Sequence, residues 1–221
     1  MNNLSPSSLG LLKDCPRCFW LAIKKGIKRP SGPFPSLPSG MDKVLKAHFD
    51  AFRDRGKLPP ELKREGVDAE LFNNTELLKV WRNNFKGIRW TDAKGNVIHG
   101  AIDNLLQKGK KLIVLDYKTR GFPLKEDTAE SYQDQLDIYN FLFRKNGYQT
   151  EDYSYLLFYH PKEIDSEGQL ILHTDLVKLE VSIKNAETII KTALEVLESD
   201  MPESSEECRF CAWAKEVLKE K

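Results

Sequence analysis

The strongest constraint on the fold is an apolar segment that ends abruptly in charged residues. Residues 100–120 read GAIDNLLQKGKKLIVLDYKTR, two apolar stretches joined by a Gly-containing turn, which predicts a β-hairpin. The second stretch, 111–118, ends in Asp116 and Lys118. Because side chains alternate along a strand, these two charges share one face with Leu112 and Val114. A strand whose other residues are suited to burial therefore places a carboxylate and an ammonium group on one face, at its end.

A second carboxylate is expected close by. Pairing about the turn at 108–110 places Asp103 roughly opposite residues 115–116. Two converging carboxylates repel each other unless a cation lies between them, and Mg²⁺ typically takes one or two carboxylates together with water and phosphate oxygens. Lys118 could then stabilise developing negative charge or help to deprotonate a water molecule. The alternative is a solvent-exposed strand end with a local Asp–Lys pair.

The rest of the chain predicts a mixed α/β domain. The hydrophobic pattern favours helices at 5–23, 40–55, 69–85, 127–145 and 183–198, strands at 88–91, 97–106, 111–118 and 153–160, one or two strands within 169–182, and a Pro-rich loop at 28–40. The helix between strands 111–118 and 153–160 predicts that these two strands are parallel neighbours. We expect a single domain over 1–221, with an N-terminal helical part (1–87), a core (88–182) and a C-terminal helix and cysteine segment (183–221).

All four cysteines occur in C-x-x-C pairs, at opposite ends of the chain. The pairs are Cys15 with Cys18 and Cys208 with Cys211. In a reducing compartment this spacing favours a metal site over disulfides, and a shared site would join the two ends of the chain. The alternative is two unrelated pairs of small buried hydrophobic residues.

The composition limits the possible partners and location. The formal net charge is +1, so a nucleic acid would have to be held by a local basic groove rather than by overall charge. Lys24, Lys25, Lys28 and Arg29 form one basic run, and Lys108, Lys110 and Lys111 form the hairpin tip. The run at 24–29 is a candidate strand-binding channel with Trp20 or Phe34 for stacking. No leader pattern and no long apolar stretch is found, so we expect a cytoplasmic protein with no membrane partner.

Two further features lie on predicted helices. Gln135 and Tyr139 are four residues apart, on one face of the helix that follows the Asp116 strand. His48 lies on an apolar helical face, where a histidine is more often a satisfied core residue than a ligand. Taken in order, His48, G-A-I-D103, D116-Y-K118-T and Q135-L-D-I-Y139 resemble the PD-(D/E)XK nuclease superfamily, in particular its RecB-type branch, which includes the CRISPR-associated Cas4-like nucleases.

The resemblance covers about residues 5–215 and implies a restriction-endonuclease-like core, a central mixed sheet flanked by helices. It implies that His48, Asp103, Asp116 and the backbone carbonyl of Tyr117 bind Mg²⁺ or Mn²⁺. It further implies that Asp103, Asp116 and Lys118 are catalytic, and that Gln135 and Tyr139 orient the substrate.

The cysteines match the iron–sulfur members of this branch only in part. Those members have one cysteine before the core and three after it, whereas this chain has two before and two after. Four thiolates suit either a [4Fe–4S] cluster or tetrahedral Zn²⁺. The family resemblance favours the cluster, the two symmetric C-x-x-C pairs keep zinc open, and the role is structural in both cases.

The expected function is a metal-dependent DNA nuclease, exonuclease-like on single-stranded DNA or DNA ends. A pathway in repair, recombination or CRISPR adaptation is implied only by the resemblance, and a helicase or CRISPR adaptation partner would be a separate chain. The alternatives are a non-catalytic nuclease-fold module that binds DNA or protein, and a redox-sensing protein built around the cysteines.

Overall fold

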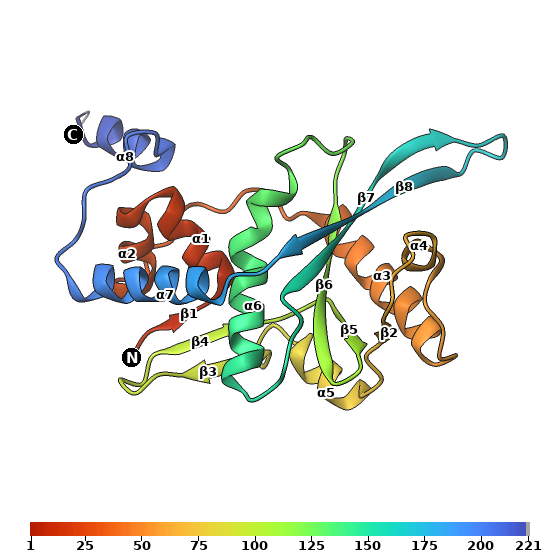
Figure 1. The fold of residues 1–221 in the computed structure, drawn as a ribbon. Coiled ribbons are helices and arrows are strands. Elements are labelled where there is room, and N and C mark those ends of the chain that lie inside the picture. The colour runs from red at the N-terminus through yellow and green to blue at the C-terminus, as the bar shows by residue number, and fades with distance from the viewer. Residues whose placement is uncertain (220–221) are drawn as a thin grey trace.

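The computed structural model describes residues 1–219, which form two β-sheets flanked by helices (Figure 1). The helices are α1 (Pro6–Asp14), α2 (Pro16–Lys24), α3 (Ser36–Arg53), α4 (Pro60–Arg64), α5 (Thr75–Trp81), α6 (Gln133–Lys145), α7 (Ile183–Glu198) and α8 (Arg209–Lys219). The strands are β1 (Asn3–Leu4), β2 (Glu70–Leu71), β3 (Ile88–Thr91), β4 (Val97–Gly100), β5 (Asn104–Lys108), β6 (Lys111–Thr119), β7 (Tyr153–Ile164) and β8 (Leu170–Glu180). The expected mixed α/β class is confirmed. Within the described residues no helix is both long and apolar enough to cross a membrane.

The larger sheet has five strands in the order β2-β5-β6-β7-β8. β5 and β6 form the predicted antiparallel hairpin, with Asn104 opposite Leu115. β6 and β7 are parallel, as predicted from the helix between them, and β7 pairs antiparallel with β8 in a long ribbon. The smaller sheet, β1-β4-β3, lies beside α6, and the chain passes from β4 of this sheet to β5 of the larger one (Figure 1).

The central strand β6 is buried on both faces. Leu112 and Val114 belong to the core beneath α6, whereas Ile113, Leu115 and Tyr117 belong to a second core that includes Leu45 and Phe49 of α3. Full burial of such a side chain contributes about 1.5–3 kcal/mol relative to exposure. Apolar packing from two sides therefore fixes the direction in which the polar residues at the end of β6 point.

Prolines account for two differences from the predicted helices. The expected helix at 5–23 is two helices, α1 and α2, because Cys15 precedes Pro16 and is extended (φ −164°, ψ 111°). Helix α3 begins at Ser36, inside the segment predicted as a loop. Pro38 lies in the first turn of α3, where a missing backbone N–H removes no helical hydrogen bond.

Capping and pairing explain the other differences. The helix expected at 69–85 spans only Thr75–Trp81, because Asn74 caps its start and Glu70–Leu71 pairs with β5. The strand expected at 97–106 is interrupted at 101–103, where the chain passes between the sheets. The helix expected at 127–145 begins as a 3₁₀ turn at Ala129–Tyr132, and 169–182 supplies the single strand β8. The short helix α4 and helix α8 were not predicted, and the division of the chain into three parts stays a prediction.

Candidate active site and metal centre

Asp116 and Lys118 lie at the buried end of β6, on the face that looks toward α6. Asp116 is only 2% exposed and is paired in register with Leu156 of β7. The Lys118 Nζ atom lies 2.5 Å from Asp116 Oδ2, forming an ion pair. The contact lacks the angles of a hydrogen bond, so this buried oxygen has no hydrogen-bond partner among residues 1–219.

Asp103 lies close to the end of β6 as well, in the short segment between β4 and β5. Its Oδ2 accepts a hydrogen bond from the backbone N–H of Tyr117 at 3.0 Å, and its Oδ1 lies 3.2 Å from Lys46 Nζ of α3. Arg82 Nε donates to the Asp103 carbonyl at 2.7 Å, which anchors this turn of the chain. The hairpin thus brings Asp103 beside the Asp116 strand, as its register predicts.

The electrostatics of this pair are unfavourable when both carboxylates lie side by side in a buried position. Burial and the neighbouring Asp103 charge raise the pKa of Asp116 to about 7, although Lys118 and Lys46 oppose the shift. The two lysines therefore do not fully offset the cost of ionising Asp116 at this buried position. The two neighbouring carboxylates form an acidic oxygen donor set that fits a hard divalent cation, which Asp103 and Asp116 would hold.

A chain of hydrogen bonds connects Lys118 to the predicted substrate-orienting residues. Lys118 Nζ donates to Gln135 Oε1 at 2.9 Å, and Gln135 Nε2 donates to the Tyr139 hydroxyl at 2.9 Å. Tyr139 in turn donates to the carbonyl of Ala101 at 2.7 Å. The lysine ammonium also lies 4.4 Å from the centre of the Tyr132 ring. These contacts fix the ammonium position from three directions.

Gly100 makes this chain of hydrogen bonds possible. A Cβ atom at this position would lie 2.6 Å from a Tyr139 ring carbon, closer than real Cβ contacts allow. A hollow of about 320 Å³ opens here, lined by Gly100, Ala101, Gln135 and Tyr139 together with residues at the start of α1. The absence of a side chain at Gly100 thus lets the tyrosine approach the backbone beside this space.

His48 is not brought together with the two aspartates. Its Nε2 atom lies 2.9 Å from Glu61 Oε1 of α4, and that same oxygen accepts a hydrogen bond from the Tyr159 hydroxyl. Tyr159 belongs to the core on the α3 side of the sheet, opposite the face of Asp116. In residues 1–219, His48, Asp103 and Asp116 do not form a set whose ligand atoms all lie within 4.8 Å of one another.

The four cysteines converge as the paired motifs predict. Cys18 Sγ lies 3.6 Å from both Cys208 Sγ and Cys211 Sγ, and Cys15 Sγ lies 3.9 Å from Cys211 Sγ. All four are free thiols whose sulfurs lie within 4.8 Å of one another. The site joins α1–α2 to the beginning of α8, so the N-terminal helices and the C-terminal segment are brought together here, as predicted; Figure 1 shows α8 above α2.

The surroundings of the thiols lower the pKa of two cysteines, Cys15 and Cys208, although burial opposes the shift at both. Burial opposes the thiolate at Cys15, but the backbone N–H groups of Cys18 and Ser205 and the neighbouring thiols lower the pKa of Cys15 to about 6. Arg29 donates to Cys208 Sγ at 3.6 Å and also stacks over the Phe210 ring. A cationic group beside thiolates suits a metal ligand set.

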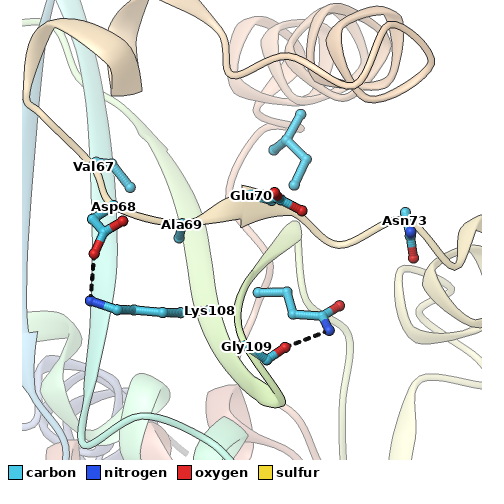
Figure 2. Close-up of a pocket in the computed structure, with 9 residues that line it drawn as sticks. Val67, Asp68, Ala69, Glu70, Asn73, Lys108 and Gly109 are labelled. Carbon is cyan, nitrogen blue, oxygen red and sulfur yellow. Dashed lines mark hydrogen bonds and ion pairs between the residues drawn. The ribbon is translucent and has the colours of Figure 1, made fainter.

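Four residues of the two basic runs, Lys25, Arg29, Lys108 and Lys111, contact partners within the chain. Arg29 belongs to the cysteine site and pairs with Asp14, and Lys25 lies over the Trp20 ring. At the hairpin tip Lys108 pairs with Asp68 and Lys111 pairs with Glu151. The first of these pairs borders a polar hollow of about 580 Å³ at the β2 edge (Figure 2), lined by residues such as Glu70 and Asn73. This hollow shares no lining residue with the aspartate site, and Phe34 is exposed.

Two residues that contact the predicted site residues were not predicted from the sequence. Lys46 contacts Asp103 and Asp42, and it lies on the helix that also carries His48. A lysine four residues after an aspartate looks like an ordinary surface pair, so only the fold reveals its contact with Asp103. Glu61 was also missed, because the short helix α4 that carries it was not predicted.

Comparison with known proteins identifies a family. The family model described as the PD-(D/E)XK nuclease superfamily matches residues 43–215, most of the chain. No curated protein matches the chain. A solved structure described as the crystal structure of SSO0001 aligns with 97% of this chain and 84% of its own, at 17% sequence identity and a TM-score of 0.42. Similarity at that level carries no argument about function.

We expect Gly100→Ala to destabilise the protein by about 1–3 kcal/mol, because the new methyl group must displace the Tyr139 ring. Urea unfolding would measure the change. Gly10→Ala is the matched control, since nothing lies within 4 Å of a Cβ at that helical position. Equal stability of the two variants would contradict the close approach of Tyr139.

We expect Asp116→Asn to stabilise the metal-free protein at pH 8 by about 1–4 kcal/mol. The folded-state pKa of Asp116 is raised above its ordinary value, so its contribution to stability falls as the pH rises from about 4 to 7. Urea unfolding in EDTA should show the gain at pH 8 and little gain at pH 4. The exposed Asp127→Asn is the control, and an Asp116→Asn variant less stable than it at pH 8 would contradict this charge balance.

Proposed function

Because the chain belongs to the PD-(D/E)XK nuclease superfamily, we propose that it is a deoxyribonuclease that hydrolyses phosphodiester bonds with a bound divalent cation. The observation that carries the proposal is the buried Asp116 carboxylate beside Asp103, whose negative charge Lys118 and Lys46 offset only in part. Asp103 and Asp116 would hold Mg²⁺ or Mn²⁺. When bound, the ion would supply charge stabilisation at the phosphate and acidify a water molecule.

Lys118 has the role of a fixed positive charge. Its ammonium group is held by Asp116 and Gln135, so no reorganisation is needed when negative charge develops on a phosphate oxygen. Gln135 and Tyr139 support this position through their own hydrogen bonds. In this proposal they act as positioning residues beside the 320 Å³ hollow, where part of a nucleotide has room.

The remaining site predictions rest on the family resemblance. His48 is left out of the ligand set proposed here, because its imidazole faces Glu61, and the Tyr117 carbonyl stays a predicted further ligand. An exonuclease-like preference for single strands or ends, and a place in repair or CRISPR adaptation, are likewise supported by the resemblance alone. A non-catalytic DNA-binding module is the competing function, and a cleavage assay separates the two.

For the four-cysteine site we propose one tetrahedral ion such as Zn²⁺. An ion with Zn–S bonds of about 2.3 Å separates its sulfurs by about 3.8 Å. Three of the six sulfur–sulfur separations, at 3.6, 3.6 and 3.9 Å, are close to this value, and all six are within 4.8 Å. A [4Fe–4S] cluster, which the resemblance favours, binds each cysteine to a different iron and would hold the sulfurs further apart. The proposed role is structural, because the site connects α2 to the segment before α8.

We expect divalent-metal-dependent cleavage of DNA that Asp116→Ala and Lys118→Ala each reduce by at least about a hundredfold. The assay uses single-stranded and duplex DNA labelled at the 5′ or the 3′ end, with Mg²⁺, Mn²⁺ or EDTA. The product ladders report polarity. Asp127→Ala is the matched control on the loop before α6. Equal DNA binding by all variants without cleavage by any would replace the nuclease with the binding module.

We expect anaerobically purified protein to contain one zinc per chain and no inorganic sulfide. Elemental analysis, a sulfide assay and the visible absorption spectrum measure this directly. Cys211→Ser should release the metal and lower the thermal unfolding midpoint, since the site closes a very long loop. Four irons and four sulfides per chain would overturn the zinc proposal and support the cluster.

A further inference from the structure

A second cluster of metal-binding side chains lies on the β7–β8 ribbon. His160 of β7 is directly opposite His173 of β8, and their ring centres are 5.2 Å apart. Asp175 lies between them: His160 Nε2 is 3.1 Å from one carboxylate oxygen and His173 Nε2 is 3.3 Å from the other. One ligand atom from each of the three residues lies within 4.8 Å of the other two.

The hydrogen bonding of His160 directs its Nε2 atom toward a carboxylate oxygen of Asp175, which is a hydrogen-bond acceptor. His160 is only 6% exposed, and its Nδ1 atom lies 3.1 Å from the Pro161 carbonyl, which can only accept a hydrogen bond. A neutral imidazole that donates from Nδ1 has a lone pair at Nε2, and this lone pair faces an oxygen of Asp175. Two acceptors at this distance need a proton or a cation between them. A backbone carbonyl that fixes the tautomer is also the usual support of a metal-binding histidine.

The position of the cluster in the fold gives it a structural purpose. β6 pairs with β7 only as far as Tyr159, so His160 and His173 form the first pair beyond the end of β6. From there the two strands leave the sheet as an isolated ribbon (Figure 1). A two-stranded ribbon is marginally stable alone, and this one has a bulge between Pro161 and Glu163.

We infer that His160, His173 and Asp175 form a site for a divalent transition-metal ion of the Zn²⁺ class, which clips β7 to β8 where the ribbon leaves the sheet. Two imidazoles and one carboxylate are a typical ligand set for such ions, and the fourth position is left to water. The half-exposed His173 side chain provides the access route, whereas His160 is fixed from within. The site is distinct from Asp103 and Asp116 and from the four cysteines, and it does not depend on nuclease activity.

The test is a titration of the protein, residues 1–221, with Co²⁺ and then Zn²⁺, with its cysteine site loaded as purified and millimolar Mg²⁺ present. We expect one further equivalent to bind, with the weak visible bands of Co²⁺ bound to nitrogen and oxygen and without thiolate charge-transfer absorption. His173→Gln and Asp175→Asn should each weaken this binding at least about tenfold. Isothermal calorimetry gives the affinities, and circular dichroism checks that the variants fold.

His99→Gln is the matched control, because this half-buried histidine lies on the separate smaller sheet. It should leave the additional equivalent unchanged. Zn²⁺ should also slow hydrogen exchange of the amides at 161–172 in the native protein and not in His173→Gln. No additional equivalent, or one that persists in both ligand variants, would overturn the inference and leave a histidine–aspartate ion-pair cluster.

Discussion

The parallel pairing of β6 with β7 is the constraint on which the rest of the structure depends. Parallel neighbours need a crossover, and α6 supplies it by returning across the face of the sheet on which Asp116 and Lys118 point. The crossover therefore carries Gln135 and Tyr139 to the end of the strand that bears the charges. Lys118, Gln135 and Tyr139 therefore meet at one end of β6, because β6 and β7 run in the same direction and α6 has to connect them.

The buried carboxylate sets the energetics of this arrangement. Asp116 lies in the central strand, where apolar packing from two sides holds it in place and leaves it only 2% exposed. Repulsion from Asp103 is only partly offset by Lys46 and Lys118. Natural proteins tolerate such a local cost at sites whose ligands or substrates remove it, so the strain is itself a reason to expect a cation here.

Local sequence signals predicted much of the fold and part of the site. Strand 88–91 and helix 183–198 match the structure residue for residue, because alternation and helical spacing are strong there. The hairpin register also placed Asp103 beside the Asp116 strand. Other features depend on contacts between distant residues, which a local sequence pattern does not reveal. Glu70–Leu71 is a strand because it pairs with the edge of β5. Likewise, the spacing of His48 gave no sign that its imidazole faces Glu61, and the cross-strand pair of His160 and His173 required the register of β7 and β8.

The cysteine site has a consequence for the order in which the molecule is assembled. Cys18 and Cys211 are separated by 193 positions, so during synthesis the first C-x-x-C pair leaves the ribosome long before its partner. The two sheets can form in that interval, but the N-terminal pair has only half of its ligands. The four sulfurs can therefore come together only after Cys208 and Cys211 have been synthesised, which is later than the synthesis of every strand of the two sheets.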